Sequence, residues 1–593
     1  MFDYLIVGAG PSGLCAAKTI LACEPDAKVK ILDANTTLGG VWSKETIYPS
    51  LKTNNIRGGI DFSDFPMHDG FGIPDGQHPT GEVMHEYYQA YAEHHDLVKL
   101  IDFDTRVCDI SRLEGSQGWR LTTEIGSKEF QTKKLLIATG ITNHPHRPVL
   151  QGAEGFDGPI IHSAELGLKG SLLFENPSVK TVAIIGGGKS AYDSVHVAGK
   201  AGRQVEWIIR KSGKGPEWIF PSRTKIGPFA TTREFLPSRR FVSFFSPCLW
   251  NDGFSMIRDF LHSTTLGKMI AQKFWANLHA AVVADCGMRN HEKTSVLEPE
   301  TSPFWYGTAS GVYKFDKDIY TMIKTGQVCV HREDISHLSP GHIHFTKDNT
   351  SIQVDALITA TGFSAHPTLS FTPASTHSDL GIPSTHLTHA QQAFWADLNQ
   401  TADLRIATQF PRLLSGPFLS PSSSTIKQYN PGADPDLDYS PFRLYRGIAP
   451  PGPTTRGDHS LAFVSMFSNL ANTPRCELQC LWAYAYLNHK LDIDTQTVFD
   501  ETALMARFAH FRAPFGHGRF FPDLVFDQLP YFDLLLQDLK LPYWRKPNLI
   551  AELFGSYRAS DYKGVVQEWL QAETGGLVAA VGTEKTPLLS DTV

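Results

Sequence analysis

The chain has 593 residues, enough for about four compact units of roughly 150 residues each, which excludes a single small binding module. Hydrophobic residues make up 41% and charged residues 19% of the chain, so it can bury a large core and is not a disordered polymer. The 54 Lys and Arg against 61 Asp and Glu give a net charge of −7, and this balance argues against nucleic acid as a partner.

Apolar runs in the sequence fall short of the roughly 20 residues that cross a bilayer, so no transmembrane helix is expected. Residues 1–7 lead directly into strand-like sequence, which predicts no cleaved signal peptide and a cytoplasmic protein. The eight cysteines show neither a CxxC pair nor the spacing of metal ligands. We therefore expect reduced structural thiols and no metal site.

The first elements in the chain are a strand, a tight turn and a helix. Residues 2–7 are apolar, and the pattern GxGxxG follows at once, with a helical pattern behind it. In such a turn the first glycine bends the chain, the second lets the backbone approach a pyrophosphate, and the third lets helix and strand pack. The residues predicted to contact this dinucleotide are Gly8, Gly10, Pro11, Ser12 and Gly13.

A second strand at residues 29–32 ends in Asp33, about 20 residues after the glycine turn, where a ribose-binding acid belongs. Because strand, turn, helix and acid occur together, a glycine-rich turn that binds no ligand is a poor explanation of the motif. The motif GG-x-W follows the acid and resembles the flavoprotein version of the fold. It adds Gly40, Val41 and Trp42 to the predicted cofactor-binding residues.

A second fingerprint, GxGxxA, follows the apolar residues 181–185 and opens a helical run. Its predicted cofactor contacts are Gly186, Gly187, Gly188, Lys189, Ser190 and Ala191. The next strand ends in Arg210 and Lys211 instead of an acid, and two cations there favour the 2′-phosphate of NADPH over NADH. A solvated strand end remains the alternative explanation of the two cations.

Two further apolar segments, residues 135–140 and 355–362, end in Ala-Thr-Gly and indicate paired crossings between two domains. Residues 118–123 favour a small antiparallel meander before the first crossing.

With these motifs in place, the chain resembles the flavin-containing monooxygenases, and more closely their fungal relatives of secondary metabolism. The family hallmark FxGxxxHxxx(Y/F) stands at residues 156–166 between the two fingerprints, with His162 at its histidine position and Leu166 in place of the aromatic residue. Baeyer–Villiger relatives carry Trp at that last position. Leu166 therefore disfavours a typical Baeyer–Villiger assignment without excluding it.

The resemblance extends to the L-x-T-N segment, which places Thr53 and Asn54 against both cofactors and makes Asn54 the expected catalytic residue, with Asn55 as the neighbouring alternative in the alignment. Val107 resembles the family position whose backbone faces the adenine of the flavin. His162 belongs to the hallmark, and its role is open between structural and functional.

The resemblance implies an FAD- and NADPH-dependent monooxygenase that forms a C4a-(hydro)peroxyflavin with O2 and inserts one oxygen atom into a small organic substrate, a secondary metabolite. Baeyer–Villiger oxidation or epoxidation of a polyketide-like substrate is the rival within enzymes. A nucleotide-sensing protein that kept the fold is the rival outside them. A disulfide reductase is excluded by the missing CxxC pair.

The expected fold is α/β, with two Rossmann-like dinucleotide-binding domains for FAD and NADPH, the second inserted in the first. We expect a first flavin segment at 1–170, the NADPH domain at 171–362 with a helical insertion at about 215–315, the flavin return segment at 363–500 and a C-terminal extension at 501–593, mobile from about residue 573. For the insertion, core packing is favoured, and a substrate lid or a peripheral membrane contact stays open.

Overall fold

The computed structural model describes residues 1–575 with short gaps. The gaps are residues 115–117, 125–127, 227–228, 314–317, 348–349, 365, 367–368, 386, 418, 421–422 and 427–438. Most of the predicted mobile tail therefore lies outside the described residues.

The first sheet carries the N-terminal strand. Among the described residues it has eight strands, in the order β21-β4-β5-β6-β1-β2-β3, with β24 also paired to β6. The neighbours β2, β1, β6 and β24 run parallel, while β4, β5 and β6 form the predicted antiparallel meander. The bounds are β1 Phe2–Val7, β2 Val29–Leu32, β3 Ile101–Asp102, β4 Val107–Arg112, β5 Trp119–Thr123, β6 Glu129–Ile137, β21 Ser370–Thr372 and β24 Leu461–Phe463.

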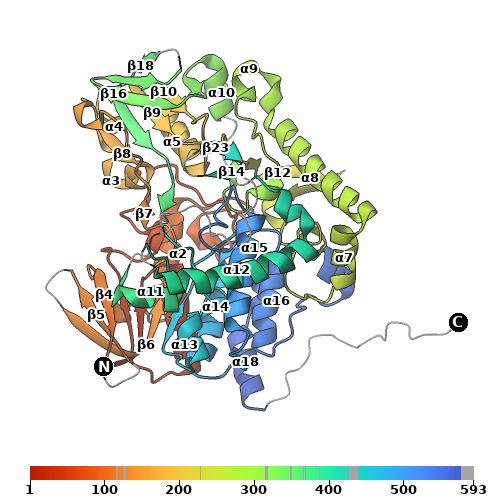
Figure 1. Ribbon diagram of the computed structural model, residues 1–593. Coiled ribbons are helices and arrows are strands. Elements are labelled where there is room, and N and C mark those ends of the chain that lie inside the picture. The colour runs from red at the N-terminus through yellow and green to blue at the C-terminus, as the bar shows by residue number, and fades with distance from the viewer. Residues whose placement is uncertain are drawn as a thin grey trace.

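The second sheet has five strands in the order β15-β10-β9-β19-β8, and every pairing in it is parallel. Figure 1 shows this sheet at the top of the molecule and the first sheet at the lower left. Its strands all fall between β6 and β24 in the sequence, so the second sheet is inserted into the chain of the first. The bounds are β8 Ile160–His162, β9 Thr181–Ile185, β10 Gln204–Ile208, β15 Val328–His331 and β19 Ala356–Thr359.

The central strands of both sheets consist of apolar runs because parallel strands are covered on both faces. The last four residues of β1 and of β9 are buried, and so is all of β19. Helix α1 (Pro11–Cys23) follows β1 and packs against α14 (Asn472–Leu487), while α5 (Lys189–Lys200) follows β9. The predicted α/β fold with two dinucleotide-binding folds is thus confirmed, while the exact domain boundaries stay a prediction.

Helices from the C-terminal part complete the core beside the first sheet (Figure 1). Helix α16 packs on α14, and α12 packs on α15. The aromatic side chains Tyr557, Tyr562 and Trp569 are buried, whereas Phe554 is 53% exposed. The bounds are α12 His389–Gln409, α15 Val498–Arg512, α16 Gln528–Asp538, α17 Leu549–Phe554 and α18 Val565–Glu573.

The expected helical insertion contains α6 (Arg240–Ser243), α7 (Ser255–Ser263) and α8 (Thr265–Cys286). The side chain of Thr264 accepts from the N–H of Gly267 and caps the amino end of α8, which separates α8 from α7. Core packing is correct for buried residues such as Trp275 and Val282. It is wrong for the outer faces of α7 and of the start of α8, which expose large apolar side chains.

Candidate functional site

The first glycine-rich turn lies at the carboxyl end of β1 and has room only for glycine. Gly8 has φ of 110°, and a Cβ on it would lie 2.7 Å from the carbonyl oxygen of Ala138. A Cβ on Gly13 would lie 1.8 Å from the carbonyl oxygen of Gly8. Gly10 caps α1 without a side-chain hydrogen bond, and Pro11 is the first helical residue. The amino end of α1 is therefore an uncapped, positively polarised cradle for an anion.

Ser12 ties this cradle to a residue that the sequence motifs did not reveal. The hydroxyl groups of Ser12 and Ser465 lie 2.5 Å apart. Ser465 follows β24 with φ of 64°, and its N–H donates to the side chain of Gln479 on α14. Since β24 and β1 are both parallel to β6, the carboxyl ends of β24 and β1 meet at the same edge of the sheet.

Asp33 follows β2 beside the glycine turn. Its carboxylate accepts from the N–H of Ala9 at 2.5 Å and of Asn35 at 2.8 Å. Burial raises the pKa of Asp33, and the two N–H donors oppose that shift. The N–H of Thr105 donates to the carbonyl of Asp33, which brings Val107, at the start of β4, to the same end of the sheet.

The GG-x-W segment lies on the glycine turn. Gly40 has φ of 61°, and a Cβ there would approach the Cα of Gly10 to 3.1 Å. The carbonyl of Trp42 lies 3.0 Å from Nδ1 of His85. Val41 is 49% exposed, so of the three predicted residues it is the one open to solvent or to a ligand.

The Thr-Asn-Asn segment separates the two candidate asparagines. Thr53 donates to the carbonyl of Asn55. The amide nitrogen of Asn55 donates to Glu234 at 2.8 Å, and the N–H of Ile56 donates to the same carboxylate at 2.7 Å. In contrast, Oδ1 of Asn54 is buried without a partner among the described residues. Asn55 is thus engaged in the fold, and Asn54 keeps an unused acceptor.

Glu234 is the second functional candidate that the sequence did not reveal. It comes from the segment before α6 and is 8% exposed. Burial raises its pKa to about 7, although the hydrogen bonds from Asn55 and Ile56 oppose the shift. A Cβ on Gly59 would lie 2.3 Å from its carboxylate oxygen, so the loop after Asn54 closes tightly around this acid.

The second glycine-rich turn repeats the geometry of the first at the carboxyl end of β9. Gly186 has φ of 146°, and a Cβ on it would lie 2.2 Å from the carbonyl oxygen of Ala360. A Cβ on Gly187 would lie 2.6 Å from the carbonyl of Gly215. Gly188 caps α5 without a side-chain hydrogen bond, so this helix also offers an uncapped amino end.

The three residues after Gly188 differ in their surroundings. Lys189 pairs with Asp193 one helical turn later at 2.9 Å. Ser190 is partly exposed, whereas Ala191 is fully buried under the turn. Tyr48 also donates to Asp193 at 3.1 Å. This bond joins the segment leading to Asn54 to the helix of the second fingerprint.

An acid lies beside the second turn. A Cβ on Gly188 would lie 2.2 Å from a carboxylate oxygen of Glu217, whose N–H donates to the carbonyl of Gly187. Burial raises the pKa of Glu217 to about 7, with the nearby cation of Lys214 acting against the shift. Burial thus favours the protonated carboxyl group, which opposes a phosphate less than an ordinary carboxylate would.

Arg210 and Lys211 follow β10, one strand along from β9, and both are exposed. In the part of the chain that the structure describes, neither side chain forms an ion pair. Both cations are therefore available to an anionic group at the edge of the second turn.

The two Ala-Thr-Gly segments cross between the sheets side by side. Gly140 and Gly362 have φ of 74° and 79°. Strand β7 (His144–Pro145) pairs antiparallel with β20 (Phe363–Ser364), and the N–H of His146 donates to the carbonyl of Gly362. The chain thus passes from one sheet to the other and back through a single two-stranded connection.

The hydrogen bonds of His162 hold its own turn together. It ends β8, is fully buried, and its Nδ1 accepts from the N–H of Ala164 at 3.1 Å. Burial lowers its pKa. Glu165 accepts from the N–H of His162 and completes a capping box.

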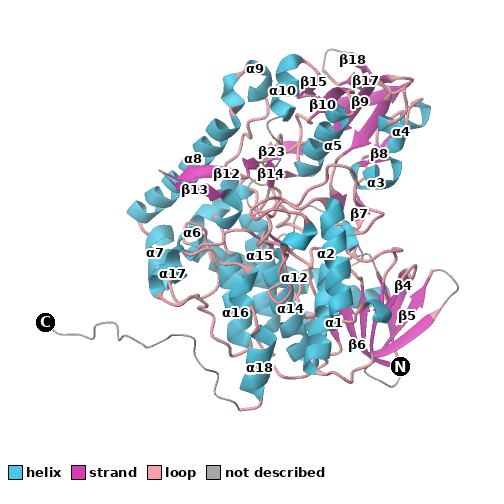
Figure 2. Cartoon of the chain, turned by 180° about the vertical axis from the view of Figure 1, so that it is seen from behind, coloured by secondary structure: helices cyan, strands magenta, loops and turns pink. Residues whose placement is uncertain are grey.

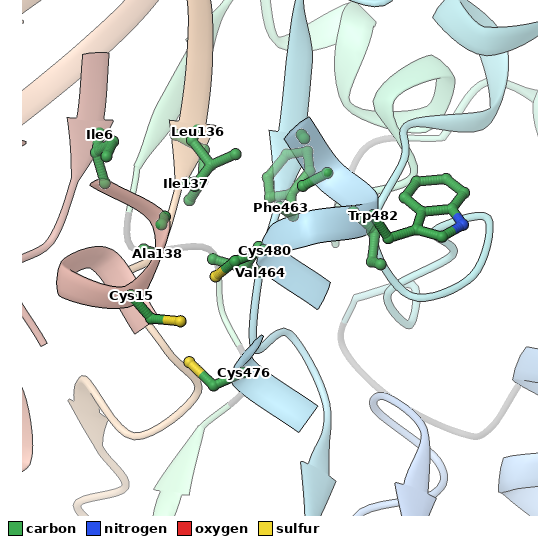
Figure 3. Packing of buried hydrophobic residues seen from close by; sticks show 14 of the residues in the cluster. Ile6, Cys15, Leu136, Ile137, Ala138, Phe463, Val464, Cys476, Cys480 and Trp482 are labelled. Atoms are coloured by element: carbon green, nitrogen blue, oxygen red, sulfur yellow. The ribbon is translucent and has the colours of Figure 1, made fainter. Parts of the chain in front are cut away.

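Beneath the first cradle, three buried thiols meet. Cys15 on α1 faces Cys476 and Cys480 on α14 (Figure 3), and the three sulfur atoms lie within 4.8 Å of one another. All eight cysteines are free. Sequence spacing missed this group because α1 and α14 are far apart in the chain.

Comparison with known proteins agrees with this geometry. The model of the family described as flavin-binding monooxygenase-like matches residues 3–373. The chain belongs to this family. An FAD-dependent monooxygenase of Aspergillus sclerotiorum, resA, is 33% identical over 96% of this chain and 98% of that protein. Human dimethylaniline monooxygenase 4 is 29% identical over 50% of this chain and 54% of that protein.

Two solved structures share the fold of this monooxygenase family member. An open crystal structure of cyclohexanone monooxygenase covers 90% of this chain and 97% of that chain with a TM-score of 0.56 and 14% identity. The S-allyl-L-cysteine S-oxygenase of Allium sativum covers 98% and 95% with a TM-score of 0.50 and 16% identity. The predicted family and the prediction of a flavin-dependent monooxygenase are confirmed.

Proposed function

We propose that the chain is an FAD- and NADPH-dependent monooxygenase that transfers one atom of O2 to a small organic substrate. The observation that carries this proposal is the pair of uncapped helix ends behind glycine turns, one after β1 and one after β9, in two sheets joined by the crossings at Gly140 and Gly362. Once bound, the flavin supplies the oxygen chemistry by taking electrons from NADPH and reacting with O2.

The FAD would lie on the first cradle. The amino end of α1 would receive the pyrophosphate, Asp33 a ribose hydroxyl pair, and the start of β4 at Val107 the adenine. Gly8 and Gly13 are required by the close backbone packing of this turn, since a Cβ on either would clash with a carbonyl oxygen, and such a tight turn before a helix supports the fit. The proposed contacts are Gly8, Gly10, Pro11, Ser12, Gly13, Asp33, Gly40, Val41, Trp42, Thr53, Asn54 and Val107.

The NADPH would lie on the second cradle, with its pyrophosphate at the amino end of α5. The exposed cations Arg210 and Lys211 would hold the 2′-phosphate, since an arginine or lysine at this strand end selects NADPH. The remaining proposed contacts are Gly186, Gly187, Gly188, Lys189, Ser190 and Ala191.

Asn54 is the proposed catalytic residue. Its buried and unpaired Oδ1 is a polar atom without a partner in the protein, and such atoms are costly unless a ligand satisfies them. Its amide would bridge the flavin edge and the nicotinamide nucleotide and exclude water there. Asn54 orients these groups and does not titrate.

The test measures flavin content by absorbance, NADPH oxidation, O2 uptake and product formation with the purified holoenzyme. Sulfide, tertiary amine, ketone and alkene probes separate the classes of oxygen acceptor, and a lactone or ester product would identify Baeyer–Villiger chemistry. A secondary metabolite as natural substrate rests on the family resemblance. If the protein bound both nucleotides without turnover, the assignment as an enzyme would be refuted and a nucleotide-sensing role would be favoured.

The variant Asn54→Ala tests the catalytic assignment. Loss of one positioned hydrogen bond is expected to lower product formation about tenfold or more and to divert O2 to hydrogen peroxide, with unchanged thermal stability. Asn55→Ala is the matched control, because it removes a donor to buried Glu234 and should lower stability. If Asn55→Ala raised peroxide release while Asn54→Ala did not, the catalytic role would belong to Asn55.

A further inference from the structure

Exposed apolar side chains gather on one part of the surface. Of the 17 large hydrophobic side chains that are exposed among the described residues, ten lie on α6, α7, the first turns of α8 and α17. We call their outer face the apolar platform, represented by Phe241, Met256, Phe260, Met269, Ile550 and Phe554. Met256 is 85% and Ile550 74% exposed, so these side chains stand out from the surface. Single exposed apolar residues are normal, but a group of this size marks an interaction site.

The platform is continuous. The rings of Phe554 on α17 and Phe241 on α6 have centroids 5.2 Å apart, and Phe241 contacts Phe245 at 5.5 Å. Phe245 stacks on Phe274 of α8 at 4.2 Å. Helix α7 packs on α8, and Figure 2 shows α6, α7 and α17 together at one edge of the molecule.

Three of these helices, α6, α7 and α17, bury charged side chains. Arg240 on α6 is fully buried and pairs with Asp533 at 2.5 Å and with Glu552 of α17 at 2.7 Å. Arg258 on α7 is 5% exposed and pairs with Asp252 at 2.6 Å. A surface helix normally turns its apolar stripe to the core and its charges to water. Helices α6, α7 and α17 instead bury a charged side chain and expose apolar ones, whereas α8 buries apolar residues such as Trp275. The arrangement of α6, α7 and α17 is favourable where the outer medium is apolar.

The charges around the platform favour an anionic surface. Lys273 is exposed and Lys268 partly exposed on α8, and Arg239 precedes α6, while Asp259 is an exposed acid on α7. Lysines beside protruding apolar side chains are typical of segments that lie in the headgroup region of a membrane. Among the described residues, the helices lack the length and apolar character needed to cross a bilayer.

We propose that the apolar platform seats the protein on the surface of a bilayer containing anionic phospholipid, without crossing it. The buried ion pairs of Arg240 and Arg258 fix the helices from behind, and the apolar side chains enter the boundary between headgroups and acyl chains. This inference does not depend on the proposed cofactors or substrate.

The test is flotation of the holoenzyme with phosphatidylcholine vesicles, with and without about one third phosphatidylserine. We expect flotation with the anionic vesicles. The double variant Met256→Glu, Ile550→Glu should lower the partition coefficient about a hundredfold, roughly tenfold per side chain withdrawn from lipid. Lys268→Gln with Lys273→Gln should weaken binding about fivefold per charge removed, on the anionic vesicles alone.

The matched control is Leu404→Glu, which changes a 63% exposed leucine on α12 away from the platform. It should float like the unchanged protein, and bound flavin should show that every variant is folded. Equal flotation of the double variant and the unchanged protein would overturn the proposal, as would failure of the unchanged protein to float. A dimer in sedimentation that the double variant dissociates, without vesicle binding, would assign the platform to self-association instead.

Discussion

The buried acid Glu234 gives a prediction about stability and pH. Its carboxylate accepts two hydrogen bonds from residues 55 and 56, and burial nonetheless raises its pKa from 4.5 to about 7. The change Glu234→Gln keeps the size and removes the charge, but it leaves one acceptor oxygen for two N–H donors. That loss does not depend on pH. Near pH 5 the native carboxyl is protonated, so the two proteins should then differ by this constant loss alone.

The direction of this pH effect on the free energy of unfolding follows from the pKa of Glu234 in the unfolded and folded states. In the unfolded chain the acid ionises near 4.5, but in the folded protein it stays protonated up to about 7. Its contribution to the free energy of unfolding is complete below the unfolded pKa and is lost as the pH rises through the folded pKa. At about 1.4 kcal/mol per pKa unit, that loss is about 3 kcal/mol. Since a small part of this loss has occurred by pH 5, the difference between variant and unchanged protein should move by about 2.5 kcal/mol in favour of the variant between pH 5 and 8.

The assay compares urea unfolding of the two proteins at several pH values, using the difference between them because other buried acids share the overall slope. Glu45→Gln is the control. Burial acts to raise the pKa of Glu45, but hydrogen bonds from Thr36 and Thr37 outweigh it and leave the pKa at about 2. Its effect should be constant from pH 5 to 8. Parallel pH profiles for Glu234→Gln and the unchanged protein would refute the reasoning.

Three shorter predictions concern the cofactor folds and the thiols. Arg210→Ser and Lys211→Ser should each raise the KM for NADPH about tenfold through loss of charge-assisted hydrogen bonds and leave the KM for NADH unchanged. If the KM values for NADPH and NADH changed equally, the two cations would not bind the 2′-phosphate and would be a solvated strand end. Gly13→Ala places a Cβ 1.8 Å from the carbonyl oxygen of Gly8. It should cost about 1–3 kcal/mol and reduce bound flavin, and full flavin content in the purified variant would contradict this. A thiol reagent should modify three half-buried cysteines in the native protein, Cys23, Cys108 and Cys329, and the other five only after unfolding. Labelling of more than three cysteines in the native protein would show that the core is looser than in this structure.

The sequence predicted those features that depend on short-range patterns. Both glycine turns, the acid after β2 and the cations after β10 are set by spacing within one strand-turn-helix unit. Glycine is required there by positive φ or by a neighbouring carbonyl, as at Gly8 and Gly186, and such demands are visible in the chain itself. The antiparallel meander of β4, β5 and β6 could be predicted for the same reason, because its strands are neighbours in the sequence.

Contacts between distant segments could not be predicted in this way. Glu234 reaches Asn55 across 179 residues, and Ser465 reaches Ser12 across 453. No local pattern marks a serine or a glutamate for such a partner. The prediction of core packing failed at α7 and at the start of α8, because helical spacing shows that a stripe is apolar but not which side of the helix faces the protein.

The paired crossings between the two sheets limit how the sheets can move. A single connecting strand would let one half of the molecule swivel about that strand. Here β7 and β20 run in opposite directions and are hydrogen-bonded to each other, so twisting one against the other would break their pairing. Bending across the pair, at the glycines beside it, is the freedom that remains. The paired crossings therefore oppose twisting of one sheet against the other, while bending at Gly140 and Gly362 would change the distance between the two glycine turns and keep their alignment.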